Sequence, residues 1–130
     1  MTIPTGSGSE VLRRNSIYNQ DITATQIDWA QAIQTAAGNS SGTVAVPANV
    51  IITILTVFFA NRSGGSEWVD MSVVNSGASG IRFLVEHTLA DTQTFVWNDK
   101  FVLRENDKLQ FDASGNDMDI HLSYIYQDWT

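Results

Sequence analysis

The sequence predicts an all-β fold, an antiparallel β-sandwich or jelly roll of about seven or eight strands. From Gly42 onward, apolar and polar residues alternate with a period of two, and β-branched residues are common. Clusters of Gly, Ser, Asn and Asp interrupt this pattern at a spacing of roughly 8–12 residues, as turns do in a sandwich. The chain has 130 residues, 43% of them hydrophobic, which suffices for one packed core. We therefore expect one sandwich domain over residues 43–130.

Residues 1–20 are predicted to form an N-terminal arm and a first strand. Residues 1–10 are small, polar and rich in Gly and Ser, a composition typical of a flexible arm. The next segment, Val11–Arg14, contains two of the seven cations and fits a short edge strand. Its two arginines are either a solvated charge pair or a basic clip that docks on an acidic neighbour.

Residues 21–42 are predicted to be an insertion that contains a short helix over about 23–37. The segment carries an apolar stripe with the helical period of 3.6 residues. The stripe consists of Ile22, Trp29, Ile33 and Ala36. Several β-branched residues weaken the helical pattern, so a strand–loop–strand arrangement is the alternative.

Eight candidate strands follow in order. Their ranges are 43–46, 50–61, 68–75, 81–89, 92–97, 100–103, 108–112 and 117–126. The second is long and almost wholly apolar, which indicates burial on both faces or a subunit contact. The last alternates strictly, with Met118 and Ile120 expected inside and Asp119 and His121 outside. A penultimate tryptophan, Trp129, indicates that the C-terminus is packed instead of frayed.

The charge balance and the absence of cysteine exclude several classes of function. Seven cations against 14 acids give a formal net charge of −7, which argues against binding to nucleic acid or to an anionic membrane. The lack of cysteine excludes disulfides, thiolate metal sites and a cysteine nucleophile. The most apolar stretch, 44–60, is interrupted by Pro47 and falls short of the roughly 20 apolar residues that cross a bilayer. The N-terminus lacks the pattern of a signal peptide, so we expect synthesis in the cytoplasm and no membrane partner.

Two polar groups near the C-terminus contain metal-ligand residue types. Asp112, Asn116, Asp117 and Asp119 supply hard oxygen ligands, but they lack the spacing of a calcium loop and fit a polar turn better. Asp117, Asp119 and His121 share one strand face at intervals of roughly 7 Å, too far apart to converge on one ion without another strand. We therefore expect a solvent-facing row, with no metal and no cofactor.

The sequence gives no catalytic motif in the context that its chemistry requires. A phosphate-binding glycine loop is missing, and the G-x-S-x-G spacing at 38–42 does not follow a predicted strand as a nucleophile elbow does, so we expect a protein that is not an enzyme, with a small hydrolase as the lowest-ranked alternative. Several aromatic side chains could stack on sugar rings, although aromatic residues more often fill cores and interfaces. They are Trp68, Trp97, Trp129, Tyr124 and Tyr126.

Four segments of the chain resemble small structural proteins in the virions of tailed bacteriophages, especially marine and cyanobacterial ones. The segments are IPTGSGSEVLRR at 3–14, VPAN at 46–49 leading into IITIL at 51–55, TFVWNDKFVL at 94–103, and SYIYQDW at 123–129. Residues 20–42 depart from the resemblance, because such proteins often pass through a short turn at this point. None of the four segments carries a catalytic motif.

The resemblance implies a capsid decoration (cement) protein that is assembled in the host cytoplasm and located in the virion. It would be a homo-oligomer, with a trimer expected, that clamps neighbouring major capsid subunits at a local three-fold axis. The alternative is a tail, neck or fibre component that binds host glycans through exposed tryptophans. The expected contact residues are Ile3, Val11, Leu12, Arg13, Arg14, Trp97, Asp128 and Trp129.

Overall fold

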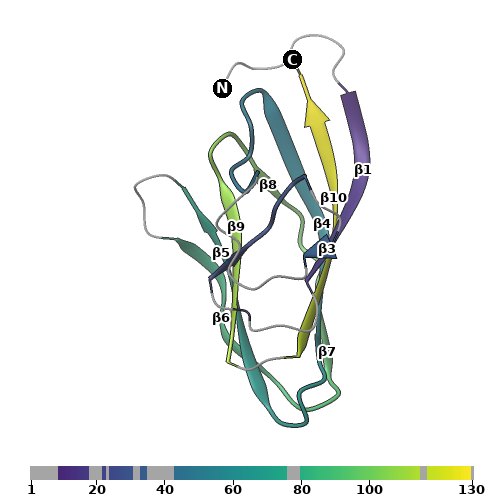
Figure 1. Cartoon of the computed structure of the whole chain (residues 1–130), viewed down its shortest axis with the longest axis vertical. Helices are drawn as coiled ribbons and strands as arrows, with labels where there is room; N and C mark the ends of the chain where they lie inside the picture. The colour runs from purple at the N-terminus through teal and green to yellow at the C-terminus, as the bar shows by residue number, and fades with distance from the viewer. Residues whose placement is uncertain are drawn as a thin grey trace.

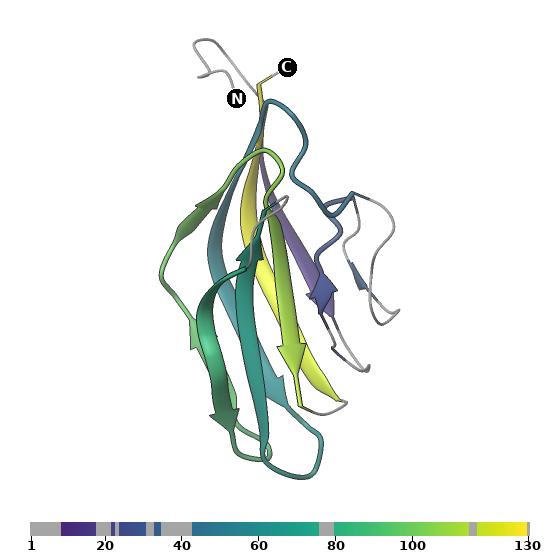
Figure 2. The same cartoon turned by 90° about the vertical axis from the view of Figure 1, so that its left-hand side faces the viewer.

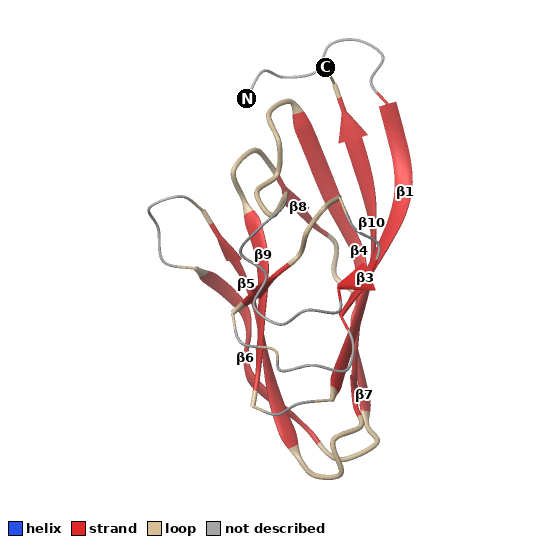
Figure 3. Cartoon of the chain, viewed as in Figure 1, coloured by secondary structure: helices blue, strands red, loops and turns tan. Residues whose placement is uncertain are grey.

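The computed structural model describes residues 9–17, 22, 24–30, 33–34, 43–75, 80–114 and 117–129. The expected all-β class is confirmed, because these residues form strands, turns and bends and none of them is helical (Figure 3). The strands are β1 (Ser9–Ile17), β2 (Thr25–Gln26), β3 (Ile33–Gln34), β4 (Val50–Asn61), β5 (Glu67–Val74), β6 (Ile81–Leu89), β7 (Thr94–Trp97), β8 (Phe101–Leu103), β9 (Lys108–Ala113) and β10 (Met118–Asp128). Within the described chain, no helix is long and apolar enough to span a membrane.

The strands form two sheets that pack face to face as a sandwich (Figures 1 and 2). The six-stranded sheet has the order β3-β1-β10-β4-β7, and β8 also pairs with β4. The four-stranded sheet has the order β2-β9-β5-β6. The pairing is antiparallel, apart from a two-residue parallel contact between β1 and β3. The long strands β4 and β10 lie side by side in the larger sheet and share its most extensive register.

Inward side chains of both sheets make one hydrophobic core. Phe59 of β4 stacks on Phe95 of β7, with 6.0 Å between ring centroids. It also meets Phe111 of β9 edge-on at 5.8 Å, so one aromatic ring joins the two sheets. Trp29 lies edge-on to Tyr124 of β10 at 5.1 Å and covers the other end of the core. Because rings of this size bury large apolar areas, these contacts fix how the sheets sit on each other.

The alternation expected for the last strand is confirmed. Of the two alternatives for 50–61, burial on both faces is wrong, and a subunit contact stays a prediction. Along β10, buried residues alternate with partly buried ones from Met118 to Ile125. The inward residues of β4 are buried as well, but its outward residues are only partly covered, and Phe58 is exposed. A sandwich has only two layers, so nothing in the described structure covers the outward side of β4.

The helix expected over 23–37 is wrong for the described residues of that range, which adopt the strand–loop–strand alternative. β2 pairs with β9, and the N–H of Ile27 donates to the carbonyl of Leu109 at 3.0 Å. Ala24 has a φ of 46°, which lies outside the right-handed helical region. The backbone donors therefore find partners on a neighbouring strand, and the β-branched residues favour that extended state. Residues 35–42 of the expected insertion lie outside the described residues.

The first strand is longer than expected. β1 pairs with β10 without interruption, from Ser9 opposite Asp128 to Ile17 opposite Ile120. The start of β1 and the end of β10 consequently lie together at one end of the sandwich (Figure 1). Residues 1–8 of the expected arm lie outside the described residues.

The strand expected over 43–46 is wrong, because this segment is a connection and not part of a sheet. The main-chain N–H of Trp29 donates to the carbonyl of Thr43 at 2.9 Å. Val46 donates to the carbonyl of Asp107 at 2.9 Å and accepts from the N–H of Asn106 at 3.0 Å. The segment satisfies its main-chain groups against two loops instead of a ladder.

The simple alternation expected for 81–89 is also wrong. The pairing of β5 with β6 shifts register twice, between Val69 and Met71 and again before Ser72. Leu84 is buried, whereas Val85 is exposed and Glu86 has a φ of 46°. An extra residue in one strand of an antiparallel pair bends the strand and breaks the inside–outside pattern, which explains the difference.

Candidate functional site

The side of the six-stranded sheet that points away from the core carries many apolar side chains. Neighbouring residues on a strand point to opposite sides, so the residues between the buried positions share this side. It is termed the outer face here, and its large apolar members are Leu12, Ile51, Phe58, Val96, Val102 and Ile125. Four of them are at least two-fifths exposed: Leu12 at 70%, Val102 at 61%, Val96 at 41% and Phe58 at 40%. Exposed apolar residues that gather in this way mark a surface for contact with another protein.

Strand register brings some of these side chains together in pairs. Leu12 lies directly opposite Ile125, and Phe58 lies directly opposite Val96. Directly opposite residues in an antiparallel pair have Cβ atoms about 4.5–5.5 Å apart, close enough for the side chains to touch. The outer face therefore carries two apolar pairs, and a polar row of Arg14, Ser123 and Thr56 lies between them.

Few described charges interrupt the outer face. They are Glu10 and Arg14 on β1 and Asp119 on β10. The carboxylate of Asp119 pairs with Arg62, with 2.8 Å between Oδ2 and Nε, and this hydrogen bond raises the pKa of Arg62. Counted with Arg62, the two positive and two negative charges cancel. The face is thus locally neutral on a chain whose net charge is −7.

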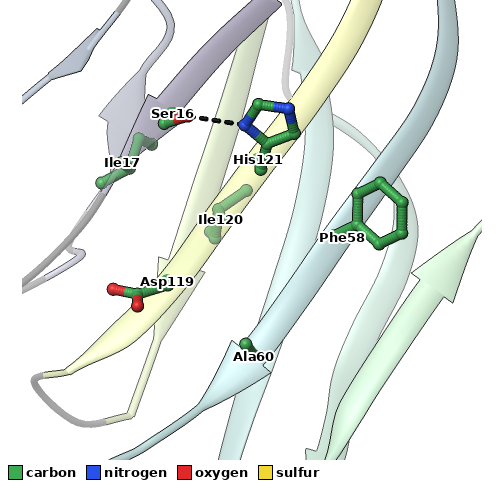
Figure 4. A pocket seen from close by; sticks show the side chains of 7 residues that line it. All are labelled: Ser16, Ile17, Phe58, Ala60, Asp119, Ile120 and His121. Carbon is green, nitrogen blue, oxygen red and sulfur yellow. Dashed lines mark hydrogen bonds between the residues drawn. The ribbon is translucent and has the colours of Figure 1, made fainter.

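A pocket of about 330 Å³ opens on the outer face over β1, β10 and β4 (Figure 4). Ala60 leaves space between the larger side chains around it, and most of the lining is apolar. Phe58 and His121 lie on adjacent strands with ring centroids 6.2 Å apart. A space of this kind accepts an apolar side chain from a partner, the usual anchor of a protein interface.

The polar residues that line the pocket are Ser16, His121 and Asp119. Ser16 Oγ lies 2.6 Å from His121 Nδ1, across directly paired positions of β1 and β10. Burial lowers the pKa of His121, and the positive charge of Arg14 lowers it further. Serine and neutral imidazole can each donate or accept, according to the imidazole tautomer, so the pair forms a cross-strand hydrogen bond. Asp119, which a catalytic triad would place against the imidazole, is instead directed to Arg62.

Most of the predicted contact residues meet where β1 begins and β10 ends. In the register of β1 with β10, Val11–Arg14 lie opposite residues 123–126 near the end of β10, and Asp128 lies opposite Ser9. The guanidinium of Arg13 lies 4.0 Å from the ring centroid of Tyr126. The main-chain N–H of Trp129 donates to the carbonyl of Asn49 at 2.9 Å, and the residue is partly buried, so the expectation of a packed C-terminus is confirmed. Ile3 lies outside the described residues.

Trp97 is separate from this group. It lies on β7 and packs against the core, with its ring stacked on Phe83 at 6.2 Å. Its indole N–H donates to the carbonyl of Asp99 at 2.8 Å. Tyr124 is buried beneath the sheet at 1% exposure. These two side chains are used inside the sandwich, which removes them from a platform for stacking on sugars.

The four-stranded sheet carries polar outward residues on β9 and β5 and also two exposed apolar residues on β6, Ile81 and Val85. Gln26 donates its side-chain amide to Gln110 at 3.1 Å across the β2–β9 pair. Asp70 accepts the backbone N–H of Glu86 in the irregular part of β6 and lies 3.8 Å from Arg82. Polar groups on this side therefore hold its own strands together.

The acidic residues considered as metal ligands have other roles where the structure describes them. Asp112 accepts the backbone N–H of Ala24 at 2.7 Å, and Asp119 is paired with Arg62. Asn116 lies outside the described residues. Within the described part of the chain, no three His, Cys, Asp or Glu side chains come close enough to hold a metal ion.

The sequence interpretation missed the opposite half of the outer face. Phe58, Val96 and Val102 are not among the predicted contact residues, although Leu12 is. The available signal was the apolar outward set of 50–61, which indicates either double burial or a contact surface. Only the two-layer architecture decides between double burial and a contact surface, because it leaves the outward residues of 50–61 uncovered.

Comparisons with known proteins give no family for this chain. No protein-family model matches it, and no curated protein matches it. Among solved structures it is similar to Eiger TNF from S. frugiperda, at 12% sequence identity and a TM-score of 0.39, over 98% of this chain and 88% of that one.

Proposed function

We propose that this chain is a structural protein of a tailed-phage virion that decorates the head by binding major capsid subunits through the outer face. The observation that carries the proposal is the exposed, locally neutral apolar surface of the six-stranded sheet. The choice of a phage virion as the particle rests on the sequence resemblance to small virion proteins.

The chemistry of the outer face favours a protein partner. Leu12, Val96 and Val102 expose apolar area to water, and burial in an interface releases roughly 25 cal/mol for each Å² covered. A phosphate backbone or an anionic membrane requires an excess of cations, whereas the charges on this face cancel. A protein surface with its own apolar patch satisfies both conditions.

Decoration also suits a domain of this kind energetically. A ligand that binds the assembled shell and not its dissociated subunits stabilises the shell by mass action. Many copies with moderate affinity achieve this together, so a flat apolar face is sufficient and a deep pocket is unnecessary.

Sedimentation with purified heads tests the proposal. The wild-type chain should pellet with expanded heads of the phage that encodes it, in numbers comparable to the capsid lattice sites. Val102→Asp places an unpaired charge in the contact and should weaken binding about tenfold or more. Val85→Asp is the matched control, because both valines are 61% exposed but Val85 lies on the other sheet.

Three results would contradict the proposal. The wild-type chain could stay in the supernatant, or Val85→Asp could weaken binding as much as Val102→Asp. A copy number of only a few per particle would favour the alternative of a tail, neck or fibre component.

A further inference from the structure

The edge strands of the two sheets differ in how readily another strand could pair with them. Outermost strands carry unpaired main-chain groups, and proteins usually protect them by shortness, bulges or coverage. β7 and β8 have four and three residues, and β2 has two. β6 is long but irregular, because its pairing shifts register and Glu86 has a positive φ.

β1 is neither short nor irregular, and its three charges, Glu10, Arg13 and Arg14, are of mixed sign. It has nine residues, and its pairing with β10 runs without a register shift. On its other side, β3 pairs only with Ser16 and Ile17. Figure 1 shows β1 as the outermost long strand of its sheet. The segment before Ser16 thus offers a regular edge to which an antiparallel strand can be added.

The side chains of this edge complement a second copy of themselves. Glu10, Leu12 and Arg14 point to the outer face, and Arg13 is held on the opposite side over Tyr126. When two such strands run antiparallel with Leu12 at the centre, Glu10 of each meets Arg14 of the other. The sequence Glu-x-Leu-x-Arg is therefore complementary in charge to a second copy of itself that runs antiparallel.

We propose that two copies of this chain join their β1 strands antiparallel about a two-fold axis at Leu12, so that the two six-stranded sheets become one continuous sheet. Leu12, the most exposed large apolar residue described, is then covered by its counterpart. Opposite charges facing each other across strands add stability on each side of the axis. The hydrogen bond of 3.2 Å from Gln127 to Glu10 is exposed and leaves the carboxylate able to reach Arg14 of the second copy.

The contact is isologous, as a two-fold interface must be. It also places the two outer faces on the same side of the joined sheet, which doubles the surface available to a partner. The pairing is tested on β1, at Glu10, Leu12 and Arg14, and the proposed capsid contact is tested on β8, at Val102, so either can fail without the other.

A cysteine placed at the axis tests the arrangement directly. The chain has no cysteine, so Leu12→Cys introduces a single thiol. Residues opposite each other in an antiparallel pair have Cα atoms about 4.5–5.5 Å apart, within the range that a disulfide spans. Mild oxidation should convert Leu12→Cys to a covalent dimer, while Ile81→Cys, which is similarly exposed at 67%, should stay monomeric. Equal cross-linking of the two variants would overturn the proposal.

Charge exchange provides a second test that does not depend on oxidation. The full-length wild type should sediment at twice the chain mass of 14.3 kDa at micromolar concentration. Arg14→Glu and Glu10→Arg each put like charges opposite one another and should raise the dimer dissociation constant about tenfold. The double variant restores both pairs and should recover the wild-type constant. A monomer at all concentrations, a trimer unaffected by these changes, or a double variant weaker than either single one would refute the two-fold pairing.

Discussion

The outward side of β9 and β5 and the outward side of the six-stranded sheet differ in chemistry. On the four-stranded sheet, Asp70 and Gln110 are hydrogen-bonded to groups of their own sheet. On the six-stranded sheet, Leu12 and Val102 project into water. Polar residues on the first side stabilise the fold, whereas apolar residues on the second have little to do within one chain. The comparison separates substitutions that damage stability from those that damage binding.

The largest effect is expected where the two sheets meet. Phe59→Ala removes the ring that contacts both Phe95 and Phe111 and should lower the free energy of unfolding by about 3–5 kcal/mol. The adjacent residue Phe58 points to the outer face, so Phe58→Ala should cost about 1 kcal/mol or less. Urea unfolding of the two variants measures the difference. Equal losses would mean that Phe58 is part of the core and that the outer face is wrongly assigned.

Substitutions of polar residues on the four-stranded sheet should lower the free energy of unfolding by less. Asp70→Ala leaves the N–H of Glu86 without its acceptor and should lower the free energy of unfolding by about 1–3 kcal/mol. Arg82→Ala removes only the 3.8 Å ion pair at the surface and should cost less than about 1 kcal/mol. Thermal unfolding of both variants, with head binding measured in parallel, checks this. A loss of head binding in folded Asp70→Ala would assign the wrong side to the partner.

A small gain in stability is expected at the bulge of β6. Glu86 adopts a φ of 46°, which costs a residue with a Cβ atom roughly 1 kcal/mol and costs glycine nothing. Part of this gain is offset because glycine also gives the unfolded chain more freedom. Glu86→Gly should therefore raise the unfolding midpoint slightly, while Val85→Gly should lower it. A lower midpoint for Glu86→Gly would show that the side chain of Glu86 contributes more than its backbone costs.

The smallest effect concerns pH. Burial, and then Arg14, holds the pKa of His121 below its ordinary value of 6.5 in the folded chain. As pH falls below 6.5, His121 takes up a proton in the unfolded chain before it does so in the folded chain. Protonation therefore favours unfolding, so the contribution of His121 to the free energy of unfolding is fully present above pH 6.5 and is lost as pH falls below it. His121→Gln should thus lose less stability than the wild type between neutral and mildly acidic pH. Urea unfolding across that range tests the sign, and a steeper loss in the variant would contradict it.

Local pattern was sufficient where one strand face is buried. The alternation of Met118 and Ile120 with Asp119 and His121 specifies which side of β10 faces the core, because a strand repeats every two residues. The alternation of β10 depends only on neighbours in the chain. The packed C-terminus was predictable from Trp129 because a large aromatic side chain usually anchors a terminus, but its partner Asn49 was not predictable.

Features that depend on distant segments were not predictable. The apolar spacing of Ile22 and Trp29 fits a helix, but the donors of this region bond to β9 and to the segment at Thr43. Likewise, nothing near Val11–Arg14 indicates that this segment lies along β10, since the pairing joins opposite ends of the chain. The outer face exists only because such pairings place Leu12 in the same sheet as Val96 and Val102.

Footprinting on the particle tests the central claim most directly. Hydroxyl-radical labelling, read by mass spectrometry, compares side-chain exposure in the free chain with exposure in the chain bound to heads. Phe58, Val96 and Val102 should become protected, while Ile81 and Val85 on the other sheet stay labelled. Protection of Ile81 and Val85, with the outer face still labelled, would contradict it.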